Sequence, residues 1–115
     1  MKTFGLALNL QNDPEKIAAY RRFHQNVWPE VTARLRAVGV QRMQIFLRGT
    51  RMFMYLITDD DFDPERDFAR INEDSTSARW NALMAELQDR IPEAGSDEWW
   101  ALMEPVFDMD WPQHR

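Results

Sequence analysis

Residues 20–30 read Tyr-Arg-Arg-Phe-His-Gln-Asn-Val-Trp-Pro-Glu, and the expected fold is organised around this stretch. Tyr20 and His24 are four residues apart, so on a helix both side chains lie on one face and can point into one pocket. The residue before a proline is disfavoured in the helical region, so the helix is expected to bend or end at Trp28-Pro29. The stretch predicts a helix end that carries an imidazole, a side chain suited to proton transfer near neutral pH.

The sequence on both sides of this stretch predicts one domain over residues 1–115. Helix starts and ends are marked by Asp13-Pro14 and Gly39 around the first helical segment, and a cap at Ser75 or Thr76 begins a later helix. Alternating apolar residues indicate strands at 3–10 and 41–48, and an apolar run indicates a third at 52–57. Further helices are expected at 64–71 and from 75 through 87, and a last strand around 106–109 that begins near Pro105.

This order, βαββαβ, is typical of the ferredoxin-like α+β fold. Helices cover one face of such a sheet and leave the other face bare. Because the expected strands carry apolar residues on both faces, the bare face needs a cover, and a second copy of the chain is the simplest one. The sequence therefore predicts a homodimer.

Composition excludes several classes of protein. The chain has a net charge of -5 and no evident basic patch, which argues against a nucleic-acid partner. It has no cysteine, so it cannot form disulfides and suits a reducing cytoplasm. No apolar run approaches the roughly 20 residues that span a bilayer, so no membrane association is expected. A cytoplasmic protein is the default expectation.

No metal or other cofactor is expected. The acidic run 59–63 lacks the ligand spacing of a calcium loop and reads as a solvated loop. His114 falls in a tail that we expect to be disordered, so no two histidines stand at metal-ligand spacing. With four glycines in all, the chain offers no phosphate-binding loop.

The candidate catalytic residues are Tyr20 and His24. Taken alone, such a pair is more often half-buried, hydrogen-bonded and inert than functional. Their neighbours favour function: Asn26 and Trp28 lie at the expected bend, where an interrupted helix frees side chains to face a cleft. Asn26 can bind a hydroxyl through its oxygen or its amide.

Tryptophans supply further candidates. Trp80, in the expected later helix, reads either as a core aromatic or as a stacking platform, with Asn81 as a polar contact beside it. Of the adjacent Trp99 and Trp100, one is expected in the core and the other at an interface or the pocket mouth, because neighbouring strand residues face opposite ways.

Several motifs together resemble the L-rhamnose mutarotase family, and the resemblance covers nearly the whole chain. They are Tyr20-x-x-x-His24-x-x-x-Trp28-Pro29-Glu30, Ile45-x-Leu47, Arg79-Trp80 and Glu104-x-Val106-Phe107. The resemblance implies a dimeric α+β barrel that interconverts the α and β anomers of a 6-deoxy sugar without a cofactor. It places the family's acid histidine on His24 and its substrate-binding tyrosine on Tyr20.

The sequence departs from the rhamnose enzymes at two substrate-binding positions. Met43 stands near the place of a sugar-contacting tyrosine, and Asn81 replaces the second of two adjacent tryptophans. The acidic loop after the third strand and the segment 98–100 resemble a bacterial subgroup linked to L-fucose. The resemblance therefore implies L-fucose as substrate, with L-rhamnose second.

The expected mechanism is acid–base ring opening. His24 would protonate the ring oxygen and return as base on closure, Tyr20 would assist, and Asn26, Trp28, Met43, Trp80 and Asn81 would bind the sugar. Two alternatives stay open, because fold does not fix function. One is a cofactor-free monooxygenase or haem-type enzyme on the same barrel, and the other is a non-catalytic binding dimer.

Overall fold

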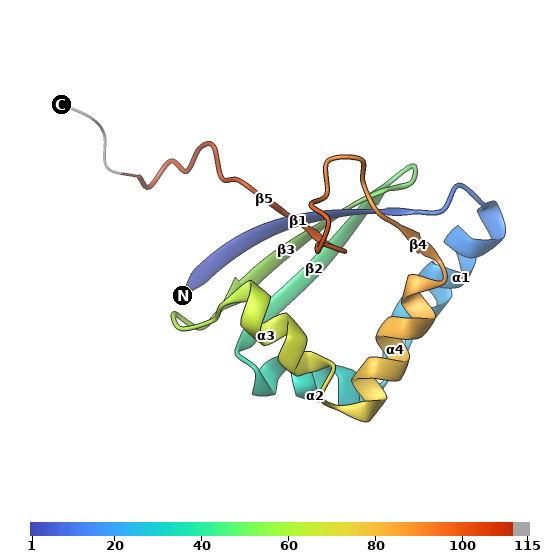
Figure 1. Cartoon of the computed structure of the whole chain (residues 1–115), viewed down its shortest axis with the longest axis horizontal. Helices are drawn as coiled ribbons and strands as arrows, with labels where there is room; N and C mark the ends of the chain where they lie inside the picture. The colour runs from blue at the N-terminus through green and yellow to red at the C-terminus, as the bar shows by residue number, and fades with distance from the viewer. Residues whose placement is uncertain (112–115) are drawn as a thin grey trace.

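An antiparallel sheet forms one layer, and the helices pack against one of its faces (Figure 1). The computed structural model describes residues 1–111, so the predicted tail position of His114 lies outside the described residues. The elements, in chain order, are β1 (Lys2–Leu10), α1 (Pro14–Gln25), α2 (Pro29–Ala37), β2 (Val40–Arg48), β3 (Arg51–Thr58), α3 (Pro64–Ile71), α4 (Ser75–Ala85), β4 (Gln88–Asp89) and β5 (Ala101–Met103).

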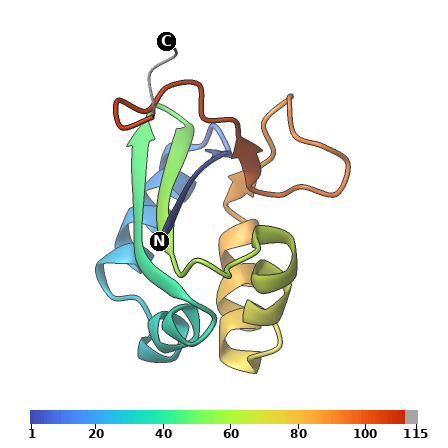
Figure 2. The same ribbon diagram turned by 90° about the vertical axis from the view of Figure 1, so that its left-hand side faces the viewer.

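The strands are hydrogen-bonded in the order β2-β3-β1-β4, and β5 also pairs with β1 (Figure 2). This order is the one expected for a ferredoxin-like fold, which confirms the predicted fold class. The two short strands share the free edge of β1. β4 pairs with Asn9 and Leu10, and β5 pairs with the segment Gly5–Ala7.

The prediction of the last strand was wrong in position. The final strand is β5, and Val106, Phe107 and Met109 follow it outside any strand, with between 75% and 83% of each side chain exposed. Pro105 explains the difference, because proline has no backbone N–H to donate to the ladder and the strand ends before it. Figure 1 shows this last segment running away from the sheet.

The predicted interruption at Trp28-Pro29 is confirmed, and it divides the first helical region into two helices. α1 ends at Gln25, Trp28 adopts an extended conformation (φ -59°, ψ 131°), and Pro29 begins α2. Proline fits the first turn of a helix because its missing N–H has no intrahelical partner there. Gly39, with φ 106°, reverses the chain after α2 into β2.

The sheet has two different faces. Its inner face supplies Leu6, Leu8, Met52, Met54 and Leu56, all at most 5% exposed, to a core shared with the helices. On the outer face, Phe46 and Phe53 stack with their ring centroids 6.3 Å apart and remain 54% and 38% exposed.

The N-cap of α4 lies before the two predicted candidates, and the helix ends at Ala85 instead of residue 87. Asp74, rather than Ser75 or Thr76, is the N-cap, and its carboxylate accepts hydrogen bonds from the backbone N–H and the hydroxyl of Ser77 at 2.9 and 2.8 Å. A carboxylate at this position also interacts favourably with the positive end of the helix dipole. The prediction considered only Ser75 and Thr76, and the register of the folded helix places Asp74 at the capping position instead.

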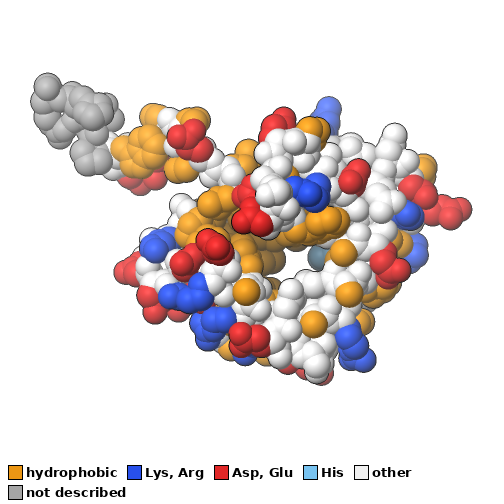
Figure 3. Space-filling view, in the orientation of Figure 1, with side chains coloured by type: hydrophobic (Ala, Val, Ile, Leu, Met, Phe, Trp, Pro, Cys, Tyr) orange, Lys and Arg blue, Asp and Glu red, His pale blue; other side chains and the backbone are white. Residues whose placement is uncertain are grey.

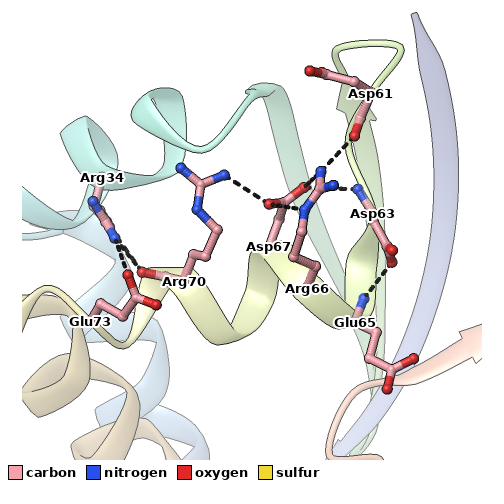
Figure 4. Close-up of polar contacts among 8 residues, drawn as sticks. All are labelled: Arg34, Asp61, Asp63, Glu65, Arg66, Asp67, Arg70 and Glu73. Carbon is pink, nitrogen blue, oxygen red and sulfur yellow. Dashed lines mark hydrogen bonds and ion pairs between the residues drawn. The ribbon is translucent and has the colours of Figure 1, made fainter.

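α3 is anchored by a buried carboxylate (Figure 4). Asp67 is 1% exposed and accepts hydrogen bonds from the Asp63 backbone N–H at 2.8 Å, from Arg66 at 2.8 and 3.0 Å, and from Arg70 at 2.9 Å. Arg66 also donates to the carbonyl of Asp61 at 2.7 Å. These hydrogen bonds, those from Arg66 first, hold the pKa of Asp67 far below its usual range.

We expect Asp67→Asn to lower the free energy of unfolding by about 2 kcal/mol, because the amide keeps the volume but leaves two guanidinium groups without their anion. A carboxyl whose folded pKa is depressed stabilises the protein above its unfolded pKa and loses that effect as pH falls. Urea titrations should therefore show the difference from native protein shrinking below about pH 4.

Asp61→Asn is the matched control, because it removes the same charge from the loop that precedes α3, where Arg66 binds only the Asp61 carbonyl. It should leave the unfolding free energy nearly unchanged. Equal losses from the two substitutions would show that net charge, and not the Asp67 contacts, carries the effect.

Candidate active site

A cavity lies between the inner face of the sheet and the helices. It consists of two lobes of about 730 and 880 Å³, and the residues common to both are Tyr20, His24, Val31, Leu35, Met43, Ile45 and Trp80. Figure 3 shows the opening, bordered by hydrophobic side chains. The volume suits a small ligand. The residues common to both lobes are apolar apart from Tyr20, His24 and the indole of Trp80, so these polar groups can orient a ligand there.

Tyr20 and His24 lie side by side in this cavity. Their ring centroids are 4.2 Å apart, and both residues come from the last turns of α1. The Nδ1 atom of His24 is 2.9 Å from the backbone carbonyl oxygen of Tyr20. A carbonyl only accepts, so Nδ1 carries the hydrogen and the neutral ring keeps its lone pair on Nε2. Burial lowers the pKa of His24, an effect only partly offset by this hydrogen bond, so the ring is neutral at pH 7.

Burial shifts the pKa of Tyr20 in the opposite direction. Tyr20 is 6% exposed, and burial raises the pKa of its phenol to about 12, although a hydrogen bond with Gln88 acts in the other direction. The phenol therefore stays protonated throughout the physiological range and can donate. One lone pair of His24 and one hydroxyl of Tyr20 thus give the cavity an adjacent base and acid.

Aromatic rings hold this pair in place. Trp80 of α4 meets His24 edge-on at a centroid distance of 5.4 Å, and Trp28 meets Trp80 edge-on at 5.2 Å. The guanidinium of Arg79 lies 5.7 Å from the centre of the Trp28 ring, within cation–π range. The break before α2 brings Trp28 against α4, so the same interruption that ends α1 also supports the imidazole.

The structure brings most of the predicted site residues together. Tyr20, His24, Met43, Trp80 and Asn81 line the cavity.

Two predicted substrate contacts lie elsewhere. Asn26 is the exposed C-cap of α1, where its backbone N–H binds the Phe23 carbonyl at 3.3 Å, and it does not line the cavity. Trp28 packs edge-on against Trp80 and does not line the cavity either. The prediction placed both at the cleft because they are at the bend, but the bend turns Asn26 toward solvent.

The segment before β5 contributes cavity residues whose positions the sequence predicted only in part. Trp99 and Trp100 both line the larger lobe, and they precede β5 instead of alternating along it. Trp100 packs against both core clusters, whereas Trp99 is 40% exposed and donates from Nε1 to Gln88 Oε1 at 2.8 Å. Nothing in the sequence marked Gln88, a single glutamine after a helix, as a cavity residue.

Two features are absent from residues 1–111. No three histidine, cysteine, aspartate or glutamate side chains gather there in a way that could hold a metal ion. None of the helices in that part of the chain has both the length and the apolar character needed to cross a lipid bilayer.

Comparison with known proteins gives a consistent result. The family described as L-rhamnose mutarotase matches residues 3–109. The chain is 43% identical over 114 residues to a UPF0734 protein of Dictyostelium discoideum, covering 96% of this chain and 91% of that protein. It is 35% identical over 109 residues to the L-fucose mutarotase of Xanthomonas campestris, covering 93% and 87%.

The fold is also shared with a solved structure. The L-rhamnose mutarotase of Formosa agariphila superposes with a TM-score of 0.69 over 96% of this chain and 100% of its own, at 19% identity. That likeness supports the fold, and the match over residues 3–109 supports the family. The adjacent acid and base in an apolar cavity suit anomer exchange, and the chain belongs to the L-rhamnose mutarotase family of sugar isomerases.

Proposed function

We propose that this protein interconverts the anomers of L-fucose, with L-rhamnose as a second substrate, by cofactor-free acid–base ring opening in the cytoplasm. The observation that carries the proposal is the side-by-side placement of His24 and Tyr20, one with a free lone pair and the other with a retained proton. Ring opening needs one group of each kind, near two oxygens attached to the same carbon.

The proton transfers balance with these two residues alone. His24 Nε2 takes the proton of the anomeric hydroxyl while the Tyr20 hydroxyl protonates the ring oxygen, and the bond between the anomeric carbon and the ring oxygen breaks. The free carbonyl rotates, the ring oxygen attacks its other face, and both protons return. His24 thus begins as the base, the reverse of the order expected from the sequence, because burial keeps the imidazole neutral.

The rest of the lining suits a 6-deoxy sugar. Met43 and Ile45 from β2 and Trp80 from α4 offer apolar surface for the methyl group and the C–H face of the ring. Asn81 donates one N–H to Asn72 Oδ1 at 2.7 Å, which leaves its carbonyl and second N–H for sugar hydroxyls.

L-fucose is preferred in this proposal for two reasons. The chain is 35% identical to a protein named L-fucose mutarotase, and at Met43 and Asn81 it lacks the aromatic residues that the resemblance assigns to the rhamnose enzymes. The two sugars differ in which ring hydroxyl is axial, and replacing aromatic rings by a thioether and an amide changes which hydroxyls find partners.

A homodimer is part of the proposal. Phe46 and Phe53 form an exposed apolar patch on the outer face of the sheet, and Gly5 beneath Phe53 leaves room for that ring, since an added Cβ would lie 2.9 Å from it. The apolar segment after β5 extends from the same sheet. A second copy, with its outer face turned to this one, would cover both surfaces and form a dimeric barrel.

Saturation-transfer NMR measures anomer exchange directly. With L-fucose and then L-rhamnose, native protein should accelerate exchange, and His24→Ala should lower the enzymatic rate by about 10²- to 10⁴-fold because the base is lost. Arg22→Ala is the control, since Arg22 is an exposed residue of α1 outside the cavity lining. Folded native protein that accelerates neither sugar would contradict the proposal and favour a binding role.

The pH dependence follows from the two pKa shifts. The base form of His24 must be populated, so the enzymatic rate should fall on the acid side with a midpoint below 6.5. Tyr20 keeps its proton until its pKa of about 12, so the rate should not fall between about pH 7 and 10. After subtraction of the uncatalysed rate, an alkaline decline in that range would contradict these roles.

Sedimentation velocity tests the dimer. Native protein should sediment with twice the chain mass, and Phe53→Arg should shift it toward the monomer by placing a charge in the apolar interface. Ala18→Arg adds the same charge at an exposed position of α1 and should leave the dimer intact. A native monomer at high micromolar concentration would refute the dimer without affecting the proposed chemistry.

A further inference from the structure

Gln88 is a buried polar residue at the edge of the cavity. It lies on the two-residue strand β4, pairs with Leu10 of β1 and is 6% exposed. Its side chain has two partners among the residues that line the larger lobe. Trp99 Nε1 is 2.8 Å from its Oε1, and its Nε2 is 3.4 Å from the Tyr20 hydroxyl oxygen.

The chemistry of the indole ring fixes the direction of both hydrogen bonds. An indole N–H can only donate, so the group of Gln88 that faces Trp99 must be the carbonyl oxygen. The amide nitrogen then faces Tyr20. An amide NH₂ can only donate, so the Tyr20 oxygen accepts a hydrogen bond from Gln88. The hydrogen of the Tyr20 hydroxyl has no acceptor on the Gln88 amide nitrogen. That hydrogen is left for another acceptor, such as one held in the cavity.

We propose that Gln88 and Trp99 are positioning residues that hold the Tyr20 hydroxyl as a hydrogen-bond donor toward the ring oxygen of the bound sugar. The proposal rests on the function proposed above and extends it to residues that do not exchange protons themselves. Neither residue takes part in proton transfer. Together they determine only that the Tyr20 hydroxyl accepts from Gln88 and directs its own hydrogen elsewhere.

The loop that carries Trp99 is itself held in place. The Glu98 carboxylate accepts from the backbone N–H of Gly95 at 2.9 Å and from that of Leu102 at 3.0 Å, across the turn that leads into β5. Arg90, at the start of the loop, donates to the Gly95 carbonyl. The position of Trp99 is therefore set by contacts on both sides of the loop. The Gln88 side chain connects Trp99 to Tyr20 of α1 through its two hydrogen bonds.

Substitution Gln88→Glu is the sharpest test, because it preserves shape while reversing one hydrogen bond. At about pH 9, the introduced carboxylate can still accept from Trp99, but it has no hydrogen to give. The Tyr20 hydroxyl must then donate to the carboxylate and is withdrawn from the sugar. We expect exchange at saturating sugar to fall about tenfold, with a smaller change in KM. Trp99→Phe frees the amide to rotate and should lower the same rate.

Asn12→Asp, an amide-to-acid change in an exposed turn outside the cavity lining, is the matched control and should leave exchange unchanged.

A double-mutant comparison separates positioning from packing. Gln88→Met should lower the exchange rate when Tyr20 is present but have little further effect in a Tyr20→Phe background. Equal effects in both backgrounds, or native rates for Gln88→Glu, would overturn the proposal.

A second readout does not depend on activity. The chain has two tyrosines, so in a Tyr55→Phe background the ¹³Cζ resonance reports on Tyr20 alone. Gln88→Met, Gln88→Glu and Trp99→Phe should each shift that resonance in folded protein, and Asn12→Asp should not. An unmoved resonance in all three variants refutes the hydrogen-bond chain. A moved resonance in a protein that accelerates neither sugar supports the chain and refutes the proposed function instead.

Discussion

The interruption of the first helical region at Pro29 is the constraint on which the site depends. An unbroken helix from Pro14 to Ala37 could pack its apolar stripe along the sheet in only one direction. The break ends α1 one residue after His24 and lets α2 turn away, so helix-end side chains border an open volume. Trp28, held in an extended conformation by the proline that follows, packs on Trp80 and braces the imidazole from α4.

Burial then gives opposite pKa shifts to the two rings that are proposed as base and acid. The same apolar surroundings disfavour the charged form of each group, so they lower the pKa of His24 and raise that of Tyr20. The imidazole keeps its lone pair and the phenol keeps its proton, which is the state that the proposed ring opening requires. Local hydrogen bonds settle the details: the Tyr20 carbonyl assigns the Nδ1 hydrogen, and Gln88 binds the oxygen of the phenol.

The two faces of the sheet keep the candidate site apart from the proposed dimer surface. The inner face holds the core and the cavity, and the outer face presents Phe46 and Phe53. A strand alternates sides at every residue, so one change on the outer face leaves the inner packing in place. The Asp67 cluster lies apart from both, where it ties α3 to the preceding loop and stabilises the covering layer of helices.

The sequence by itself determined the helix break, the order of the elements apart from β4, and most of the candidate site. Period-2 and helical patterns, Pro29 and Gly39 act locally, and the spacing from Tyr20 to His24 places both on one helix face wherever that helix packs. Tertiary structure alone decided the rest. It moved the last strand to Ala101–Met103, because a strand forms where β1 offers free backbone groups, and it turned Asn26 outward. It also joined Gln88 to Tyr20 across 68 positions, a hydrogen bond that no local pattern encodes because it forms only after β4 pairs with β1.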